Sequence, residues 1–281
     1  MPGISAQRAT LRSLVSPHGG GRQGTTAGGG QGGQLTSGGA RLGRPRRGVL
    51  WAALAVAAAA AVIAAGVYES LGEDDDLAAY DRPVLDFFAT HRLAWLTPLV
   101  AAFTKVGSAP VLSVLLLLLV GALCWRRRTL YPVLALGGAA AASVLLTVLL
   151  KNALDRPRPP YELAVPPFES SGSFPSGHTL NSTALVLVLV YLFWRFGVGR
   201  RLAVLATVLG LLYIAAMGLS RLYLGAHWLT DVVSGWALGV MVAALAVAVD
   251  RLLLRRTPAV IVAPPAARAG GAGPDGDSVS A

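Results

Sequence analysis

The sequence has one cysteine and few charged residues. Because Cys124 stands alone, a disulfide within the chain is excluded, and cysteine usage does not indicate a redox compartment. Charged residues make up 14% of the 281 residues and hydrophobic ones 54%, a balance that excludes an ordinary soluble domain. The scarcity of charge predicts an all-α transmembrane helical bundle.

Acidic residues are also scarce. There are 14 Asp and Glu against 24 Lys and Arg, which gives a net charge of +10. Such an excess can indicate nucleic-acid binding, but most of the basic residues lie in short clusters beside apolar runs, a pattern typical of membrane orientation. We therefore expect membrane lipids as partners and no nucleic acid.

Six apolar runs are long enough to cross a hydrocarbon core, which takes about 20 helical residues. They cover residues 48–68, 109–125, 129–150, 179–196, 202–219 and 228–254. The stretch 81–105 mixes charge, aromatics and apolar residues around Pro98, which interrupts its middle, and predicts an interfacial or re-entrant helix packed against the bundle. We predict one six-span membrane domain over residues 48–254.

The two ends of the chain have a different composition. Residues 1–47 are rich in Gly, Ser, Thr, Gln and Arg, and residues 255–281 are rich in Ala, Pro and Gly. Neither can bury enough apolar surface to offset the entropy of ordering, so both are predicted to be disordered tails. A cleaved signal peptide is the alternative for the first run, but the tail before it is much longer than a charged n-region.

The basic clusters give an orientation. Under a six-span topology they fall on alternate connections and share one side with both termini, which the positive-inside rule assigns to the cytoplasm. The connections after the first, third and fifth spans then face the extracytoplasmic side. We expect a multi-pass protein of the cell membrane.

The connection after the fifth span carries polar side chains that lipid packing does not require. It reads SRLYLGAHWLTD over residues 220–231. His227 and Asp231 are four apart, so a helix from Trp228 onward places both on one face, the geometry for a carboxylate that orients a nucleophilic histidine. The Arg221 guanidinium suits a phosphate or carboxylate oxygen. The alternative is an interfacial histidine, a helix-start acid and a snorkelling arginine.

The connection after the third span begins with KNALDRPRPP. Lys151 ends the span, and Arg158 follows between two prolines that force an extended chain. Alternatively, Lys151 snorkels or pairs with Asp155, and Arg158 is an ordinary loop cation. Three other charged residues of this connection, Asp155, Arg156 and Glu162, are interpreted as salt-bridged or solvated; contact with substrate is the alternative for Arg156.

The same connection ends with FPSGHT, residues 174–179, at the start of the fourth span. Ser176 can cap the helix, Gly177 lets the backbone approach a ligand, and the first free N–H groups form an anion cradle beside His178. A plain turn and cap is the alternative.

Together, the three clusters resemble the type 2 phosphatidic acid phosphatase family, which includes undecaprenyl-diphosphatases and phosphatidylglycerophosphate phosphatases. The family pattern is K, six residues, RP; PSGH; and SR, five residues, H, three residues, D. Every position and spacing is present between Lys151 and Asp231. The resemblance implies a membrane lipid phosphate phosphatase whose site faces the extracytoplasmic side.

The resemblance also implies the role of each residue. His227, held by Asp231, attacks phosphorus and forms a phosphohistidine, while His178 protonates the leaving alcohol and then activates water. The phosphate-binding groups are Lys151, Arg158, Ser176, Gly177 and Arg221. We expect no metal and no cofactor, because cations replace the metal and no carboxylate cluster would hold magnesium. A bell-shaped pH profile is expected, because the two imidazoles start in opposite protonation states.

Three other functions remain open. They are a lipid phosphotransferase, a non-catalytic binder of lipid phosphate, and a transporter or channel. The motifs do not choose between a phosphatidic acid-like and an undecaprenyl diphosphate-like substrate, and they do not indicate an oligomeric state.

Overall fold

The computed structural model divides the chain into two units, residues 1–42 and 43–281. It describes residues 47–73, 77–166 and 168–253, all of them in the second unit. The predicted disordered tails therefore lie outside the described residues, except for Arg47, which begins a helix. In the described ranges all regular structure is helical, which confirms the all-α class.

Each predicted apolar run corresponds to one long helix; four runs lie wholly within theirs, while 129–150 and 228–254 begin two residues and one residue before theirs. The helices are α1 Arg47–Glu73, α4 Ala109–Arg127, α5 Tyr131–Leu154, α6 Gly177–Phe196, α7 Arg200–Tyr223 and α8 Leu229–Leu253. Most extend a few residues past the apolar run, because backbone hydrogen bonding continues beyond the hydrophobic part. As a result, Lys151 and Arg221 lie in the last turns of α5 and α7.

Five helices of the described chain are long and apolar enough to cross a membrane. They are α1, α5, α6, α7 and α8, which supports a multi-pass membrane protein. Helix α4, 19 residues long, is not among the five, so the membrane span predicted over residues 109–125 stays a prediction.

The stretch 81–105 forms two helices, α2 Asp81–Thr90 and α3 Leu96–Val106, and both pack on α7. The prediction that Pro98 interrupts the middle of a helix was wrong. Pro98 is the third residue of α3, where a missing N–H removes no intrahelical hydrogen bond. The chain leaves the helix at residues 91–95 instead.

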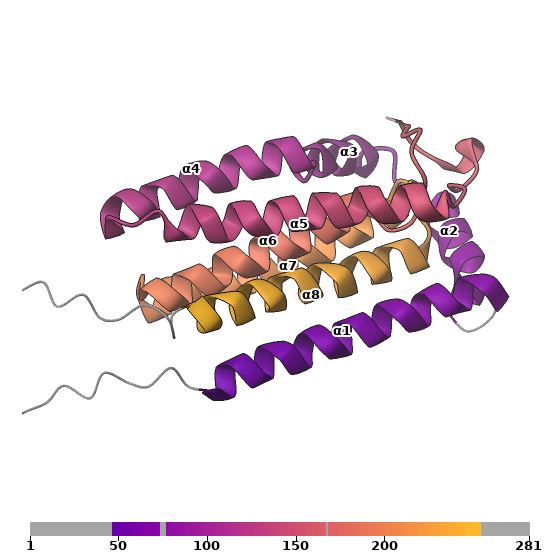
Figure 1. Ribbon diagram of the computed structural model, residues 1–281. Coiled ribbons are helices and arrows are strands. Elements are labelled where there is room, and N and C mark those ends of the chain that lie inside the picture. The colour runs from indigo at the N-terminus through magenta and orange to yellow at the C-terminus, as the bar shows by residue number, and fades with distance from the viewer. Residues whose placement is uncertain (1–46, 74–76, 167, 254–281) are drawn as a thin grey trace, which may run out of the picture. The chain divides into compact units, whose positions relative to one another are not determined.

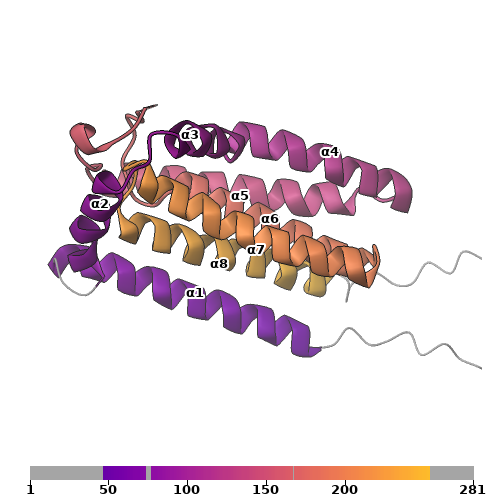
Figure 2. The same cartoon turned by 180° about the vertical axis from the view of Figure 1, so that it is seen from behind.

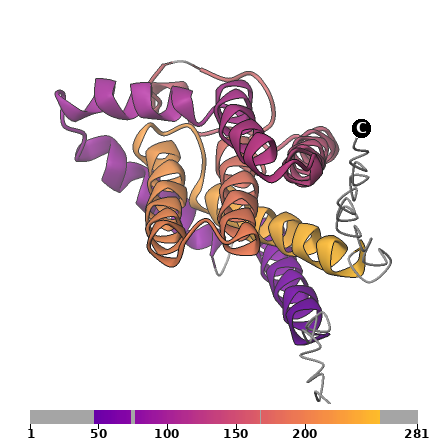
Figure 3. The ribbon, with the colours of Figure 1, turned by 90° about the vertical axis from the view of Figure 1, so that its left-hand side faces the viewer.

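Helix α6 lies at the centre of the helices and packs against α4, α5, α7 and α8, while α1 packs on α8 (Figures 1 and 2). In the apolar stretch that could cross a membrane, 56% is buried inside the protein in α6 and in α8, against 22–28% in α1, α5 and α7. The view along the helices shows α1 beside α8 (Figure 3). The two best-buried helices thus begin in the FPSGHT cluster and at the end of the SRLYLGAHWLTD cluster.

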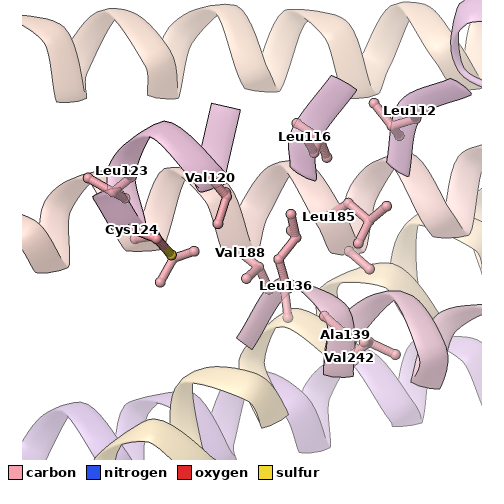
Figure 4. Close-up of a cluster of buried hydrophobic side chains, with 13 residues drawn as sticks. Leu112, Leu116, Val120, Leu123, Cys124, Leu136, Ala139, Leu185, Val188 and Val242 are labelled. Carbon is pink, nitrogen blue, oxygen red and sulfur yellow. The ribbon is translucent and has the colours of Figure 1, made fainter. Parts of the chain in front are cut away.

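The largest apolar core joins α4, α5, α6 and α8 (Figure 4). In α4 the buried residues Leu112, Leu116, Val120 and Cys124 recur every four positions, the spacing of one helix face. They pack with residues of the neighbouring helices that include Leu136, Leu185, Val188 and Val242. The cysteine is therefore a packed core side chain.

Two glycines bring α8 close to α6. A Cβ atom at Gly235 would lie 2.9 Å from Thr179 Cβ, and one at Gly239 would lie 2.5 Å from Thr183 Cβ. The Gly235 and Gly239 pair therefore serves packing within the bundle, as the small-residue spacing predicts. The contact brings the first turns of α6 and α8 together.

The polar clusters lie at one end of the bundle. Figure 1 shows α2 and the connection between α5 and α6 at this end, while α1 begins and α8 ends at the opposite end. The connection between α7 and α8, residues 224–228, also lies at the α2 end. This arrangement gathers three segments far apart in sequence.

Candidate active site

Backbone hydrogen bonds tie the three clusters to one another. The Ser176 amide donates to the Asp231 carbonyl at 3.0 Å, and the Ser173 amide donates to the Arg156 carbonyl at 2.8 Å. Because main-chain atoms make these bonds, the relative positions of the clusters are fixed before any side chain is considered.

His227 precedes α8, which begins at Leu229 rather than at Trp228. Its Nδ1 lies 3.3 Å from Oδ2 of Asp231 in the first turn of the helix, and both side chains are fully buried. The expected pairing is thus present, although the histidine stands in the connection. Burial lowers the pKa of the His227 imidazole to about 4, and the hydrogen bond to Asp231 offsets only part of this. The imidazole is therefore neutral at pH 7.

The Asp231 carboxylate is held on both oxygens. Its Oδ2 accepts from the Trp228 amide at 2.9 Å and from the Ser173 hydroxyl, and its Oδ1 accepts from Arg156 Nη1 at 2.7 Å. Charge-assisted bonds of this kind are about twice as strong as neutral ones. The carboxylate therefore has little freedom to turn away from His227.

Arg158 approaches Nε2, the ring nitrogen of His227 that is not paired with Asp231. Its Nη1 lies 3.3 Å from His227 Nε2 and donates to the Ala226 carbonyl at 2.8 Å. Its Nη2 donates to Glu169 Oε2 at 2.8 Å. A guanidinium thus lies directly beside the imidazole nitrogen that Asp231 leaves free.

Arg221 approaches the same carboxylate from α7. Its Nη2 lies 2.5 Å from Glu169 Oε1, and its Nη1 donates to Thr104 Oγ1 at 3.0 Å. The side chain is 4% exposed. Two arginines predicted to bind phosphate therefore meet on one carboxylate.

Glu169 is the site residue that sequence reasoning missed. Its Oε1 also lies 3.8 Å from Nδ1 of His178, in the first turn of α6. Burial alone would raise the pKa of this carboxyl, but the positive charges of Arg221 and Arg158 outweigh it and lower the pKa to about 2. Glu169 is thus an ionised carboxylate among the predicted phosphate ligands. An isolated acid in a proline-rich connection gave no signal that separated it from Glu162.

Lys151 and Arg158 converge on the same short segment. The Lys151 ammonium donates to the Gly172 carbonyl and, at 3.3 Å, to Ser171 Oγ. Arg158 Nε donates to the Ser171 carbonyl at 2.8 Å. Residues 171–172 therefore hold Lys151 and Arg158, the two cations of KNALDRPRPP that are predicted to bind phosphate.

Ser176 and Gly177 differ in part from expectation. Ser176 is the N-cap residue of α6, but its side chain makes no capping hydrogen bond and instead accepts from Thr179 Oγ1 at 3.0 Å. The capping prediction was wrong, because the buried hydroxyl is taken up by the next turn. A Cβ atom at Gly177 would lie 3.1 Å from Thr147 Cγ2, so the glycine also lets α6 approach α5.

Arg156, interpreted as salt-bridged or solvated, is salt-bridged on two sides. Its Nη2 lies 2.7 Å from Oδ2 of Asp81, an α2 residue that the sequence did not single out, and its Nη1 lies 2.7 Å from Asp231 Oδ1. The network therefore extends beyond the three motifs.

The donor set of the site is cationic. Within the described ranges, no group of three or more His, Cys, Asp or Glu side chains is placed to hold a metal ion. The positive charge beside His227 comes instead from Lys151, Arg158 and Arg221. Such an arrangement can bind an anion and present it to an imidazole.

Comparison with known proteins gives consistent relatives. The PAP2 superfamily matches residues 132–254. Phosphatidylglycerophosphatase B of Bacillus subtilis strain 168 is 29% identical over 203 residues, 69% of this chain and 92% of that protein. Decaprenylphosphoryl-5-phosphoribose phosphatase of Mycobacterium tuberculosis H37Rv is 32% identical over 133 residues, 47% of this chain and 68% of that protein.

A solved structure resembles the fold as well. The crystal structure of the first transmembrane PAP2 type phosphatidylglycerolphosphate phosphatase from Bacillus subtilis has a TM-score of 0.60 and 25% sequence identity. The match covers 73% of this chain and 98% of the chain in that crystal structure.

Proposed function

The chain belongs to the PAP2 superfamily, and on this basis we propose that it is a membrane lipid phosphatase that works through a phosphohistidine at the extracytoplasmic face. Its substrate is a lipid phosphomonoester or diphosphate: the relatives reported above are named as phosphatases of phosphatidylglycerophosphate and of a decaprenyl-linked phosphate, and the motifs are equally compatible with a lipid diphosphate.

One observation carries the proposal: the guanidinium that lies beside Nε2 of a buried imidazole already binds an anion. The Glu169 carboxylate is bound by Arg158 and Arg221, and Arg158 lies 3.3 Å from His227 Nε2. A phosphate that displaces this carboxylate would meet the same donors. Arg221 Nε is buried and, among the described residues, has no hydrogen-bond partner, so it is a further donor for a phosphate oxygen.

His227 is the nucleophile. With Nδ1–H donated to Asp231, Nε2 carries the lone pair, which accepts from Arg158 Nη1 at 3.3 Å until a bound phosphate takes up that guanidinium, and the lowered pKa keeps Nε2 unprotonated. Nε2 forms a bond to phosphorus while the bond from phosphorus to the lipid oxygen breaks. Asp231 stabilises the positive charge that the imidazole acquires.

His178 is the acid and then the base. Its side chain is 20% exposed and lies 3.8 Å from Glu169 Oε1, the oxygen that Arg221 also binds, and it donates a proton to the departing lipid oxygen. It then takes a proton from the water that breaks the N–P bond, which releases inorganic phosphate and restores both imidazoles.

The positive charge that phosphoryl transfer requires comes from side chains. Lys151, Arg158 and Arg221 bind the equatorial oxygens, with the Gly177 and His178 amides and Ser176 at the first turn of α6 as further donors. The reaction therefore proceeds without a metal ion.

The position of the site in the bundle fits a lipid substrate. The three clusters lie where apolar helices end, so the phosphate is at headgroup depth while the hydrocarbon tail stays in the membrane. The positive-inside rule assigns this end to the extracytoplasmic side.

The test is phosphate release by the purified full-length protein in detergent with excess chelator. Phosphatidic acid and undecaprenyl diphosphate are assayed in parallel, with His227→Ala beside the wild type. Release that disappears in His227→Ala supports the phosphohistidine, and acid-labile, base-stable 32P bound to the wild type identifies it. Release that persists in His227→Ala overturns the mechanism, loss of activity in chelator overturns metal independence, and phosphate passed to an added alcohol identifies a phosphotransferase.

A further inference from the structure

Asp81, in the first turn of α2, is bound to the first turn of α8. Its Oδ1 accepts from the Thr230 amide at 2.9 Å, and its Oδ2 accepts from Thr230 Oγ1 at 2.7 Å. The residue is 6% exposed. A buried carboxylate that is 149 residues away in sequence thus sits next to the position that precedes Asp231.

Arg156 lies between two carboxylates. Its Nη2 donates to Asp81 at 2.7 Å and its Nη1 donates to Asp231 Oδ1 at 2.7 Å. The two terminal nitrogens of one planar guanidinium thus bind different carboxylates. The Trp228 ring covers the guanidinium, with Arg156 Cζ 5.7 Å from the ring centroid, and the Arg156 side chain is 19% exposed. Both acids therefore depend on this guanidinium for charge compensation.

The two oxygens of Asp231 have separate duties. Oδ1 is bound by Arg156, and Oδ2 faces His227 Nδ1 at 3.3 Å. Oδ2 also accepts from the Trp228 amide and the Ser173 hydroxyl, but the χ2 torsion of aspartate is broad, so loss of the bond to Oδ1 would let the carboxylate tilt about those contacts. The bond to Arg156 therefore fixes the direction of Oδ2 together with these two donors.

We propose that Asp81 and Arg156 are positioning residues of the reaction: Asp81 anchors Arg156, and Arg156 holds Asp231 so that Oδ2 keeps the Nδ1 proton of His227. The inference rests on the proposed role of His227 as the nucleophile. It extends the catalytic network to α2, outside the segment 132–254 that matches the superfamily.

The arrangement also sets the proton affinity of the His227–Asp231 pair. A guanidinium on Asp231 lowers the negative charge that the imidazole faces, so the Nε2 lone pair stays free of a proton at lower pH. Removal of Arg156 leaves Asp81 and Asp231 as two buried carboxylates with no cation between them. The pair then binds a proton more strongly, and the nucleophile is lost at a higher pH.

Four variants in the full-length protein test this: Arg156→Gln, Asp81→Asn, the double variant, and Asp86→Asn as control. Asp86 is on the same helix but is 46% exposed and pairs with Arg82. We expect Arg156→Gln to lower kcat by about tenfold or more with KM little changed, and to move the acid limb of kcat/KM upward by about one pH unit. Asp86→Asn should match the wild type.

The double variant separates coupling from general damage. Because Asp81→Asn removes one of the two uncompensated carboxylates, the double variant should have a higher kcat than Arg156→Gln alone, by about threefold or more. Independent structural roles would instead lower kcat further. The other charged groups that face the pair are unchanged in every variant: Lys151 on α5, Arg158 and Glu169 in the connection, His178 on α6, and Arg221 on α7.

Losses that add in the double variant, with an acid limb that does not move, would overturn the inference. If Arg156→Gln does not fold, Arg156→Lys keeps the charge but cannot bridge both acids, so kcat should fall while the acid limb stays in place; wild-type kcat in Arg156→Lys would overturn the inference equally. His227→Ala is measured alongside. Activity retained there overturns the phosphohistidine proposal and this inference with it, whereas additive losses with an inactive His227→Ala overturn the inference alone.

Discussion

Glu169 Oε1 lies 2.5 Å from Arg221 Nη2, so a carboxylate of the chain itself occupies a guanidinium that the sequence assigns to phosphate. Arg158 binds the other oxygen of the same carboxylate at 2.8 Å. A phosphate must therefore displace one negative charge before it can use either arginine.

Glu169→Gln removes this competition while it keeps the shape of the side chain. The pKa of Glu169 is about 2, so the competitor is charged throughout the working pH range. We expect the inhibition constant of inorganic phosphate to fall about tenfold, because the two guanidinium groups then gain their first anionic partner from the ligand. Glu162→Gln, an exposed acid of the same connection, is the control. An inhibition constant that stays unchanged or rises would show that Glu169 supports the site instead.

The pH dependence of activity follows from His227. Its pKa of about 4, lowered by burial from 6.5, means that the nucleophile proposed here becomes protonated in the free enzyme only below about pH 4. The acid limb of kcat/KM should thus lie well below the ordinary histidine range, and the profile of phosphate release from pH 3.5 to 9 would locate it. A limb at pH 6 to 7 would contradict a buried neutral nucleophile.

The same histidine should make the folded protein sensitive to acid. Its pKa is lower in the folded than in the unfolded state, so between pH 6.5 and 4 the unfolded chain binds the extra proton and stability falls as pH falls. The difference is up to about 3 kcal/mol across that window. Thermal unfolding in detergent at pH 7, 5.5 and 4 would measure it. His227→Gln lacks the group, so its melting temperature should decline less; parallel declines would place the acid sensitivity elsewhere.

Arg158→Lys tests the planar fork. The guanidinium holds the Ala226 carbonyl with one nitrogen and Glu169 with another, which a single ammonium at that position cannot reproduce. We expect kcat/KM to fall by about a hundredfold although the charge is kept. Arg82→Lys is the matched control, since Arg82 also pairs with an acid but is 63% exposed. Equal activity in the two variants would mean that charge alone suffices.

Gly239→Ala tests the contact that aligns α6 with α8. The added Cβ would lie 2.5 Å from Thr183 Cβ and 2.8 Å from the Leu180 carbonyl, so the helices must separate. We expect a loss of about 1–3 kcal/mol in stability, with reduced activity because His178 and Asp231 are on these helices. Gly137→Ala, where nothing lies within 4 Å, should leave the melting temperature unchanged or slightly higher. A stable, fully active Gly239→Ala variant would refute the close packing.

Local pattern was sufficient to locate the long helices and to predict which side chains the fold brings together. Each apolar run corresponds to one helix, to within two residues at its start, because a membrane span must satisfy its own backbone hydrogen bonds, which makes length and hydrophobicity decisive. The fixed spacings around Arg158, His178 and His227 were informative for a similar reason, since each motif stands at the end of a span.

The features that were missed depend on tertiary contacts. Asp81 stands between Tyr80 and Arg82, both exposed, and only the folded chain places it against Thr230. Glu169 is no different from Glu162 until two arginines reach it. The stretch 81–105 was misread around Pro98, because proline is tolerated in the first turn of a helix and the first turn was not located from the sequence.

The packing of α1 on α8 bears on how the protein is made. A ribosome delivers α1 before α8, so α1 waits in the membrane without its main neighbour while the helices between them are made. His227 and Asp231 arrive with α8. A nascent chain can therefore carry Lys151, Arg158 and the PSGH turn to the membrane, yet it lacks the histidine that we propose as the nucleophile until α8 has been made.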